Sequence, residues 1–440
     1  MKKNIKKYPI ILFVLLTSTI ILVKYNKNQQ QKILSNYNYS VITIKEATLY
    51  SKKNKLYQKI GTVEKNVVLT LNKKIDYKNK LFNAKINNDN YYIYYDDVKK
   101  INYKSKSSKR YKKYILFNEN IITKNKFTLF DEDNNKVFEL NKSISFPIII
   151  KESNKYGVEF ENQLFFIKKE DVLNTINKHN TDILNTPKIG VLNYHFFWDD
   201  DIENKNVCNQ IICHSKTEFK KHLDLIKKMN LLTINMKELE MYIDGKIQLP
   251  PSIVITIDDG WRAELGIKIL NEYQMNGTLF LITGSYDPNG YKTKNNKYVE
   301  IHSHTNKLHD PGLCPGGQGS GLKCLPKKQI INDLNESREK LNGSEVLCYP
   351  FYEYNDYTIL LVKEAGFKMA FAGENNINNN YVIVGSDKFR LPRFVISTTT
   401  TINDLIEYFQ WKYFFCKITL KYYKNNIKYA KIVIVCRKRE

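Results

Sequence analysis

The chain has 440 residues, 42% of them hydrophobic, a composition that excludes an intrinsically disordered protein and allows two or three domains. Its formal net charge is +24 at pH 7, and its pI is near 9.4. A positive surplus of that size favours anionic partners, with nucleic acid as the first class to consider.

The first 30 residues combine a basic start with an apolar stretch. Lysines at positions 2, 3, 6 and 7 precede the run 8–23, in which Thr17, Ser18 and Thr19 are the polar interruptions. This pattern is typical of a secretory signal or a membrane anchor, and we favour an uncleaved anchor because no small-x-small cleavage site follows. Either segment exports the rest of the chain, which argues against nucleic acid as the partner.

Two stretches that follow, 41–101 and 114–172, echo each other. Residues 47–50 (ATLY) correspond to 127–130 (FTLF), and both stretches alternate apolar and polar residues in short runs, as small β-barrels do. They resemble degenerate bacterial SH3-type modules, which commonly bind cell-wall peptides or glycans. A plain β spacer between membrane and catalytic region is the alternative.

Most of the basic excess lies in this N-terminal part, including the run 104–113. A solvated lysine face is one interpretation. In the envelope of a Gram-positive bacterium, however, anionic cell-wall polymers would bind such a surface electrostatically. We therefore expect an extracytoplasmic monomer, anchored to the membrane or secreted into the wall.

The segment 188–410 alternates predicted strands with predicted helices. Such alternation indicates an α/β domain with a parallel barrel and its chemistry at the carboxyl ends of the strands. We assign no role to the extension 411–440. The predicted strands are 253–257 and 278–282, and the predicted helices are 218–229, 263–275, 328–341 and 357–365.

Two adjacent carboxylates, Asp258 and Asp259, end the apolar, β-branched run 253–257. A buried strand with this ending delivers both side chains to its carboxyl end. One carboxylate can then bind a metal while the other acts as a base, as the activation of a water molecule requires. The alternative is an ordinary Asp-Asp-Gly turn.

His304 and His309 follow on a predicted strand-to-loop junction. With Asp259 they form a two-histidine, one-carboxylate set, which binds a divalent cation and leaves positions open for water and substrate. Surface histidines are the alternative, but the chain has only 7 histidines, and three fall between His302 and His309.

These motifs resemble those of the polysaccharide deacetylases, the NodB-homology or carbohydrate esterase family 4 group, over 188–405. The family motif Thr-Phe-Asp-Asp-Gly matches 256–260 with isoleucine in the phenylalanine position, and His-Ser/Thr-x-x-x-His matches 304–309. The resemblance implies a distorted (β/α)7 barrel. It also implies Asp258 as the catalytic base and Asp259, His304 and His309 as ligands of Zn²⁺ or, alternatively, of Co²⁺, Ni²⁺ or Mn²⁺.

The third family motif, Arg-x-x-x-x-Pro-Tyr/Phe-Gly, appears as 348–352 (CYPFY), without the arginine and with Tyr352 in the glycine position. The resemblance assigns the backbone N–H of Phe351 to an oxyanion and places Pro350 and Tyr352 in a substrate-binding wall. Trp261 is expected to stack on a sugar ring or, alternatively, to pack in the core.

The fourth family motif assigns Arg393, in preference to Arg390, to orienting Asp258 and lowering its pKa. The fifth supplies a general-acid histidine near the C-terminus, but no histidine follows His309. His195 resembles the Tyr-His of a circularly permuted subset that deacetylates poly-N-acetylglucosamine, and it is our candidate acid. A structural histidine at a strand end is the alternative.

Export makes the 7 cysteines candidates for disulfides. Cys208 lies close to Cys213, and Cys314 lies close to Cys324, so we predict two local bridges that pin loops beside the metal site. Cross-pairing between the loops and a zinc site built from the four thiolates are the alternatives. The other cysteines are predicted to be a buried thiol, at Cys348, and a pair, Cys416 with Cys436.

The leading hypothesis is a hydrolase that removes N-acetyl groups from N-acetylglucosamine units of peptidoglycan or of poly-N-acetylglucosamine. His195 favours the exopolysaccharide, and the paired β modules favour the wall. The alternatives are an O-acetyl esterase on wall or xylan-like sugars and a non-catalytic wall-binding protein. The complete set of Asp258, Asp259, His304 and His309 argues against the last of these.

Overall fold

The computed structural model describes residues 40–438 except for 72–74, 77, 87–88, 102–110, 161–162, 178–187, 293–295, 374–380, 410–413 and 421–431. The chain divides into two compact units, Met1–Lys112 with Leu116–Thr181, and Lys113–Ile115 with Asp182–Glu440. The predicted anchor or signal segment, 1–30, lies outside the described residues. Within the described part, none of the helices has the length and hydropathy needed to span a bilayer.

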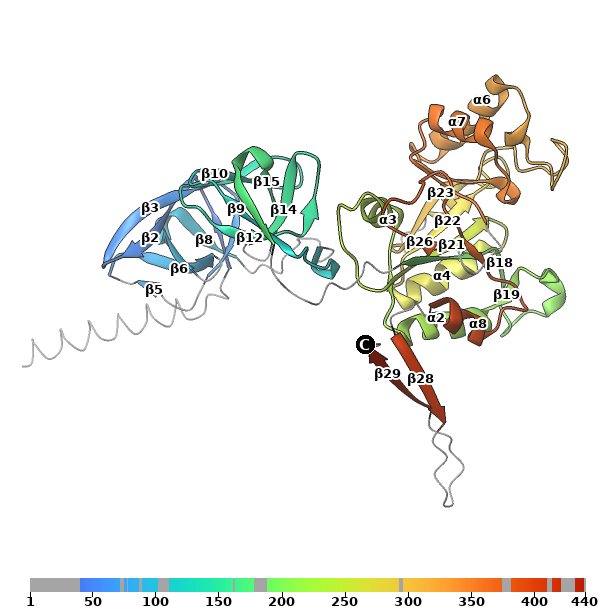
Figure 1. Ribbon diagram of the computed structural model, residues 1–440, viewed down its shortest axis with the longest axis horizontal. Coiled ribbons are helices and arrows are strands. Elements are labelled where there is room, and N and C mark those ends of the chain that lie inside the picture. The colour runs from blue at the N-terminus through green and yellow to red at the C-terminus, as the bar shows by residue number, and fades with distance from the viewer. Residues whose placement is uncertain are drawn as a thin grey trace, which may run out of the picture. The chain divides into compact units, whose positions relative to one another are not determined.

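The first unit consists of strands and 3-10 turns that occur twice in the same order (Figure 1). The first copy comprises β1 (Ser40–Thr43), β2 (Ala47–Lys53), β3 (Leu56–Val63), β4 (Val68–Thr70), β5 (Ile75–Asp76), β6 (Leu81–Ile86), β7 (Asp89–Tyr94), η1 (Tyr95–Asp97) and β8 (Val98–Lys100). The second comprises β9 (Glu119–Thr123), β10 (Phe127–Phe130), β11 (Lys136–Leu140), β12 (Ser145–Pro147), β13 (Ile150–Lys151), β14 (Lys155–Phe160), β15 (Gln163–Lys168), η3 (Lys169–Asp171) and β16 (Val172–Asn177).

The two copies also pair their strands in the same way. Each contributes a three-stranded sheet, in the orders β4-β1-β8 and β12-β9-β16. The other strands form one ten-stranded sheet, β13-β14-β15-β10-β11-β3-β2-β7-β6-β5, which β11 and β3 join in antiparallel register. The strand order therefore repeats, while the assignment of the copies to the SH3 type stays a prediction.

The two copies share one core. Phe127 and Leu129 of β10 are buried, while the residues that alternate with them are partly exposed, as in a strand with one face on a core. Leu49 of the first copy lies in the same cluster of buried side chains as Leu129. At the joint between the copies, a Cβ on Gly61 would come within 2.1 Å of the Glu139 carbonyl oxygen. Glycine therefore permits the close approach of β3 to β11.

The second unit is a mixed α/β structure, as predicted, around a mostly parallel sheet of order β25-β24-β23-β22-β21-β17-β26. In addition, β20 pairs with β21 and β27 pairs with β17, and β26 is antiparallel to β17. The strands are β17 (Ile189–Tyr194), β20 (Leu232–Thr233), β21 (Ser252–Asp259), β22 (Gly277–Leu281), β23 (Val299–Ser303), β24 (Val346–Cys348), β25 (Met369–Phe371), β26 (Tyr381–Val382) and β27 (Phe394–Val395).

This sheet forms a half-barrel in which the edge strand β25 and the strand β17 both contact the segment 391–395. Phe371 of β25 forms an isolated parallel bridge with Leu391, and β27 pairs in parallel with Leu192 and Asn193 of β17. The complete seven-stranded barrel stays a prediction. Because the strands are parallel, the carboxyl ends of β17, β21, β23 and β24 meet on one side, which is where a site is expected.

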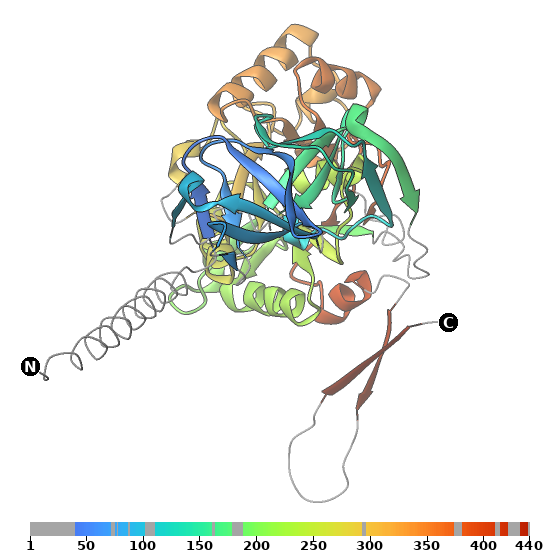
Figure 2. The same ribbon diagram turned by 90° about the vertical axis from the view of Figure 1, so that its left-hand side faces the viewer.

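Helices connect these strands, and four of them begin and end within two residues of the predicted bounds: α2, α4, α6 and α7. Figures 1 and 2 show α6 and α7 packed side by side. The helices are α2 (Lys216–Lys228), α3 (Met236–Ile243), α4 (Ala263–Tyr273), α5 (Pro288–Tyr291), α6 (Lys327–Lys340), α7 (Asp356–Glu364) and α8 (Ile402–Phe409).

The structure contains both predicted local disulfides, Cys208–Cys213 and Cys314–Cys324. All four sulfur atoms are used in these bridges, so the alternative zinc site of four thiolates is not formed. Near the C-terminus, β28 (Phe414–Leu420) and β29 (Ile432–Lys438) form an antiparallel hairpin whose register places Cys416 opposite Cys436 (Figure 2).

Candidate active site

Two adjacent aspartates at the carboxyl end of β21 form the centre of the site. Asp258 is 1% exposed, and Asp259, the last residue of the strand, has a left-handed backbone with φ of 73°. Strain of this kind gathers at functional sites. Although the two residues are neighbours, both carboxylates reach His304, whose Nε2 lies 3.9 Å from an Asp258 oxygen and 3.3 Å from an Asp259 oxygen.

The second pair of side chains comes from the loop after β23. His304 is buried, and its Nδ1 donates a hydrogen bond of 2.9 Å to the carbonyl oxygen of Cys348. This bond places a proton on Nδ1, so Nε2 is the nitrogen that faces the two carboxylates. Burial lowers the pKa of His304, but its interactions with Cys348, Asp259 and Asp258 outweigh burial and raise the pKa well above its usual value. His309 Nε2 lies 3.1 Å from His304 Nε2 and 3.3 Å from the Asp259 carboxylate. Burial lowers the pKa of His309 to about 4, which keeps its ring neutral.

These three residues fit a divalent metal ion. The Nε2 atoms of the two imidazoles and one oxygen of the Asp259 carboxylate converge to 3.1–3.3 Å from one another. Ligands bound to a tetrahedral ion at 2.0–2.1 Å would lie about 3.3 Å from one another. The predicted ligand set Asp259, His304 and His309 is therefore assembled in the geometry that such an ion requires.

The other aspartate, Asp258, is paired with a buried arginine. One terminal nitrogen of Arg393, which is 0% exposed, donates to both oxygens of Asp258, at 2.8 and 2.9 Å. Burial alone would raise the pKa of Asp258, but the charge of Arg393 outweighs it and holds the pKa well below its usual value. Arg390, in contrast, is at the surface and pairs with Asp387 and Asp356.

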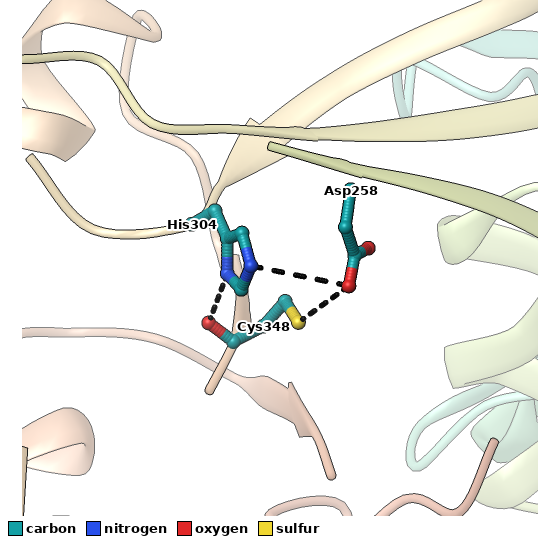
Figure 3. A group of neighbouring side chains, drawn as sticks. All are labelled: Asp258, His304 and Cys348. Carbon is teal, nitrogen blue, oxygen red and sulfur yellow. Dashed lines mark hydrogen bonds and ion pairs between the residues drawn. The ribbon is translucent and has the colours of Figure 1, made fainter. Parts of the chain in front are cut away.

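A buried thiol completes the surroundings of this carboxylate. Figure 3 shows Asp258, His304 and Cys348 turned toward one another. The Cys348 sulfur lies 3.5 Å from an Asp258 oxygen and accepts a hydrogen bond of 2.9 Å from Arg393. The sequence predicted that Cys348 is buried but not that it contacts Asp258. Its position just before Pro350, in the third motif, was the available signal.

His195 follows β17 and lies beside the same carboxylate. Its Nε2 is 4.0 Å from an Asp258 oxygen and 3.5 Å from the Tyr352 hydroxyl. Its Nδ1 is buried and has no hydrogen-bond partner among the described residues. Burial lowers the pKa of His195. The structure thus brings together the residues predicted as base and acid, which lie 63 positions apart in the sequence.

The third motif forms a wall with an unusual backbone. Phe351 and Tyr352 have φ of 57° and 63°, the left-handed region in which glycine is at ease. The Tyr352 hydroxyl donates to Asn193 at 2.7 Å, and the Arg393 guanidinium lies 5.2 Å from the Tyr352 ring centre. Pro350 is buried and begins this turn. Its predicted contact with the substrate stays a prediction.

Two further residues flank the site. Trp261 follows the aspartates and is 38% exposed, with its ring edge against Phe196 at 4.9 Å between centres. Its exposure leaves surface for the predicted sugar contact and is more than a core residue would have. His302 bonds Ser344 through Nδ1 at 3.0 Å and lies 3.7 Å from Glu300. It is therefore a packing residue outside the ligand set.

Part of the second unit is similar to known proteins. Residues 246–370 match the family model described as polysaccharide deacetylase. No curated protein sequence matches the chain. Among solved structures, a de-N-acetylase from Aggregatibacter actinomycetemcomitans is 20% identical over 50% of this chain and 99% of its own, with a TM-score of 0.42. IcaB from Ammonifex degensii is 17% identical over 51% of this chain and 98% of its own, with a TM-score of 0.40. The deacetylase PplD from Streptococcus pyogenes is 17% identical over 51% of this chain and 100% of its own, with a TM-score of 0.42. The family match over 246–370, together with the assembled motifs, identifies this chain as an enzyme with a polysaccharide deacetylase domain.

Proposed function

We propose that the enzyme is a metal-dependent hydrolase that removes N-acetyl groups from N-acetylglucosamine units of a cell-wall or extracellular polysaccharide. The observation that carries this proposal is the position of Asp258. It is a buried carboxylate held by Arg393, it is not needed for the three-ligand set, and it lies next to that set through His304. A base beside a metal site is the arrangement that water-driven hydrolysis requires.

The ligand set is proposed to hold Zn²⁺, with Co²⁺, Ni²⁺ or Mn²⁺ as alternatives. Such an ion, when bound, supplies Lewis acidity toward the acetyl carbonyl and toward water. Asp258 then accepts the proton of the attacking water. Its low pKa keeps the carboxylate ionised and ready to accept this proton at neutral pH.

The leaving amine must gain a proton when the C–N bond of the acetamide breaks, and His195 is proposed to donate it. Because burial lowers the pKa of His195, its ring is proposed to take this proton from Asp258, which received it from the water, and to pass it to the amine. His195 lies within 4.0 Å of the Asp258 carboxylate, so acid and base serve the same reacting centre. The backbone N–H of Phe351 is proposed to donate to the developing oxyanion. Acetate and a free glucosamine amine are the products.

Trp261 and Tyr352 are proposed to bind the sugar chain beside this centre. Trp261 is exposed and Tyr352 is partly buried, and an aromatic ring with exposed surface suits the apolar face of a sugar.

The N-terminal unit is proposed to hold the enzyme at its polymer. The repeated β modules and the lysine-rich composition of the N-terminal part support binding to anionic wall polymers outside the cytoplasm. The basic and apolar segment 1–30 supports an anchor in the membrane of a Gram-positive cell. Both proposals rest on sequence pattern and charge.

Release of acetate tests the activity. The purified full-length chain, loaded with Zn²⁺ or Co²⁺, would be incubated with peptidoglycan and with poly-N-acetylglucosamine. We expect acetate from one of the two polymers and a loss of about 10²–10⁴-fold in the Asp258→Asn variant, since general-base catalysis contributes that much. Asparagine keeps the shape of the side chain, so metal binding by the variant serves as the control for folding.

The outcomes separate the alternatives. Acetate from a single polymer identifies the substrate. Acetate only from O-acetylated wall or xylan-like sugars would replace the amidase by an esterase. A metal-loaded chain that releases no acetate from any of these, while still binding the wall, would be the non-catalytic protein.

A further inference from the structure

One face of α6 carries polar side chains where a helix that packs on a domain usually carries apolar ones. Asp333, Glu336, Ser337 and Lys340 follow the spacing i, i+3, i+4, i+7, which places them along one side of the helix. Asp333 is 7% exposed and Ser337 is 0% exposed. All four contact the segment 303–307, which contains the first metal ligand, His304, and leads to the second.

Asp333 makes the central contact between this polar face of α6 and the segment 303–307. Its two carboxylate oxygens accept the backbone N–H groups of Asn306, at 2.9 Å, and Lys307, at 2.6 Å. The carbonyl oxygens of Thr305 and Asn306 are already paired with the chain that follows β22. Two successive N–H groups on one carboxylate form an anion-binding concavity of the kind known as a nest. Asp333 therefore fixes the loop midway between His304 and His309.

The Asn306 side chain is held on all sides. Its amide nitrogen donates to Glu336 at 2.8 Å, and its oxygen accepts from Lys340 at 2.8 Å and from Thr283 at 3.0 Å. Asn306 is 1% exposed. With these bonds the side chain has one orientation, and the backbone that carries it is fixed as well.

The start of the loop is fixed in the same manner. The hydroxyls of Ser337 and Ser303 lie 2.7 Å apart, and Ser303 also accepts the N–H of Thr305 at 3.1 Å. Thr305 has a left-handed backbone with φ of 68°. This conformation is unfavourable for threonine, so the surrounding bonds must impose it.

Packing α6 through polar side chains is unfavourable for stability, because the Asp333 carboxylate is buried. Burial raises the pKa of Asp333 even though two N–H groups bond its carboxylate. An apolar residue would avoid that cost but would leave two loop N–H groups without acceptors, at about 1–3 kcal/mol each. Close by in the same loop, Leu308 packs in the cluster that also contains Leu334 of α6. Apolar packing thus holds the loop against the helix, and the Asp333 carboxylate fixes the backbone conformation of the loop.

We propose that Asp333 is a positioning residue for the metal site: by holding the N–H groups of Asn306 and Lys307 it sets the spacing of His304 and His309. The proposal rests on the metal-dependent function given above. Its test nevertheless measures metal binding directly and does not depend on turnover.

The test is the affinity of the metal-free full-length chain for Zn²⁺ and Co²⁺, titrated in competition with a chromophoric chelator. Asp333→Asn keeps the shape but offers one acceptor oxygen for two N–H groups, so we expect affinity to fall about 10–100-fold, as for other residues that orient metal ligands. Glu336→Gln is the matched control on the same helix face. Its amide oxygen still accepts the bond from Asn306, so affinity should stay within about threefold of wild type.

A merely structural role predicts a different result. It would lower the stability of the metal-free and metal-bound forms equally and leave the affinity unchanged, since a ligand stabilises only through its affinity for the folded state. Wild-type affinity in Asp333→Asn would therefore overturn the proposal. If that variant does not fold, Asp333→Ser, which also offers only one acceptor oxygen to the two N–H groups, decides: a weaker affinity supports the proposal, and an unchanged one overturns it. Metal binding without acetate release would instead count against the proposed activity alone.

Discussion

The two units of this chain bury different kinds of side chain. The N-terminal unit has an almost wholly apolar interior, and its buried Thr43 and Thr123 bond backbone groups of neighbouring turns. The deacetylase unit buries an arginine, an aspartate and several histidines where its parallel strands end. Buried charges are costly unless paired, so their concentration at one end of a sheet marks the working part of the molecule. The apolar unit has no such concentration among its described residues and is stabilised by packing.

The largest effect is expected from breaking the charged pair. Arg393→Met leaves Asp258 buried without its partner, which should destabilise the deacetylase unit by about 3–5 kcal/mol and reduce acetate release by about 10²–10⁴-fold. Denaturant unfolding and acetate assays measure the two effects. Arg390→Met is the matched control, since that arginine forms exposed ion pairs worth about 0–1 kcal/mol. Equal losses in the two variants would refute the assigned role of Arg393.

A core substitution in the N-terminal unit should lower the stability of that unit and leave the catalytic rate unchanged. Leu129 is 0% exposed in the shared core, and Leu129→Ala should cost about 2–5 kcal/mol there. Hydrogen exchange should show faster opening of β10 and its neighbours, while acetate release from a small soluble substrate stays at the wild-type rate. A parallel loss of activity would mean that the units depend on each other for folding.

A smaller effect should distinguish the units by pH. Burial, together with the neighbouring charges of His214 and Lys221, lowers the pKa of His222 to about 4, although Glu218 acts in the opposite direction. Above pH 6.5 the ring is neutral in both the folded and the unfolded chain, so its contribution to stability is complete. Between pH 6.5 and 4 only the unfolded chain gains the proton, and up to about 3 kcal/mol should be lost.

The N-terminal unit has no histidine among its described residues and should change little in that window. Unfolding followed across the pH range, in wild type and His222→Gln, tests this. The variant should show a shallower loss of stability in the deacetylase unit, and an identical slope would exclude His222 as a cause.

Local patterns allowed much of the fold to be predicted. The helix α2 has an apolar stripe and an N-cap in Ser215, which accepts from the Glu218 N–H, and its bounds follow from those signals. The site residues Asp258, His304 and His309 were found because each lies in a compact motif at a strand end. Such signals involve residues that are close together in the sequence, so a single sequence is enough to recognise them.

Other contacts carried no such signal. A polar face on α6 looks the same in the sequence whether it meets water or the loop that holds His304, so the role of Asp333 appears only in the fold. The contact of Cys348 with Asp258 joins residues 90 positions apart and depends on how β21 and β24 are arranged. Burial of Pro350 likewise follows from the turn that it begins.

The joint between the repeats also affects association between molecules. An open edge of a β-sheet can recruit a strand from another chain, and proteins avoid this with very short edge strands. Here β3 and β11, which would each be an open edge in a separate copy, cover one another. The edges that the ten-stranded sheet keeps are β5 and β13, with two residues each. Duplication with fusion thus leaves the ten-stranded sheet little template for aggregation.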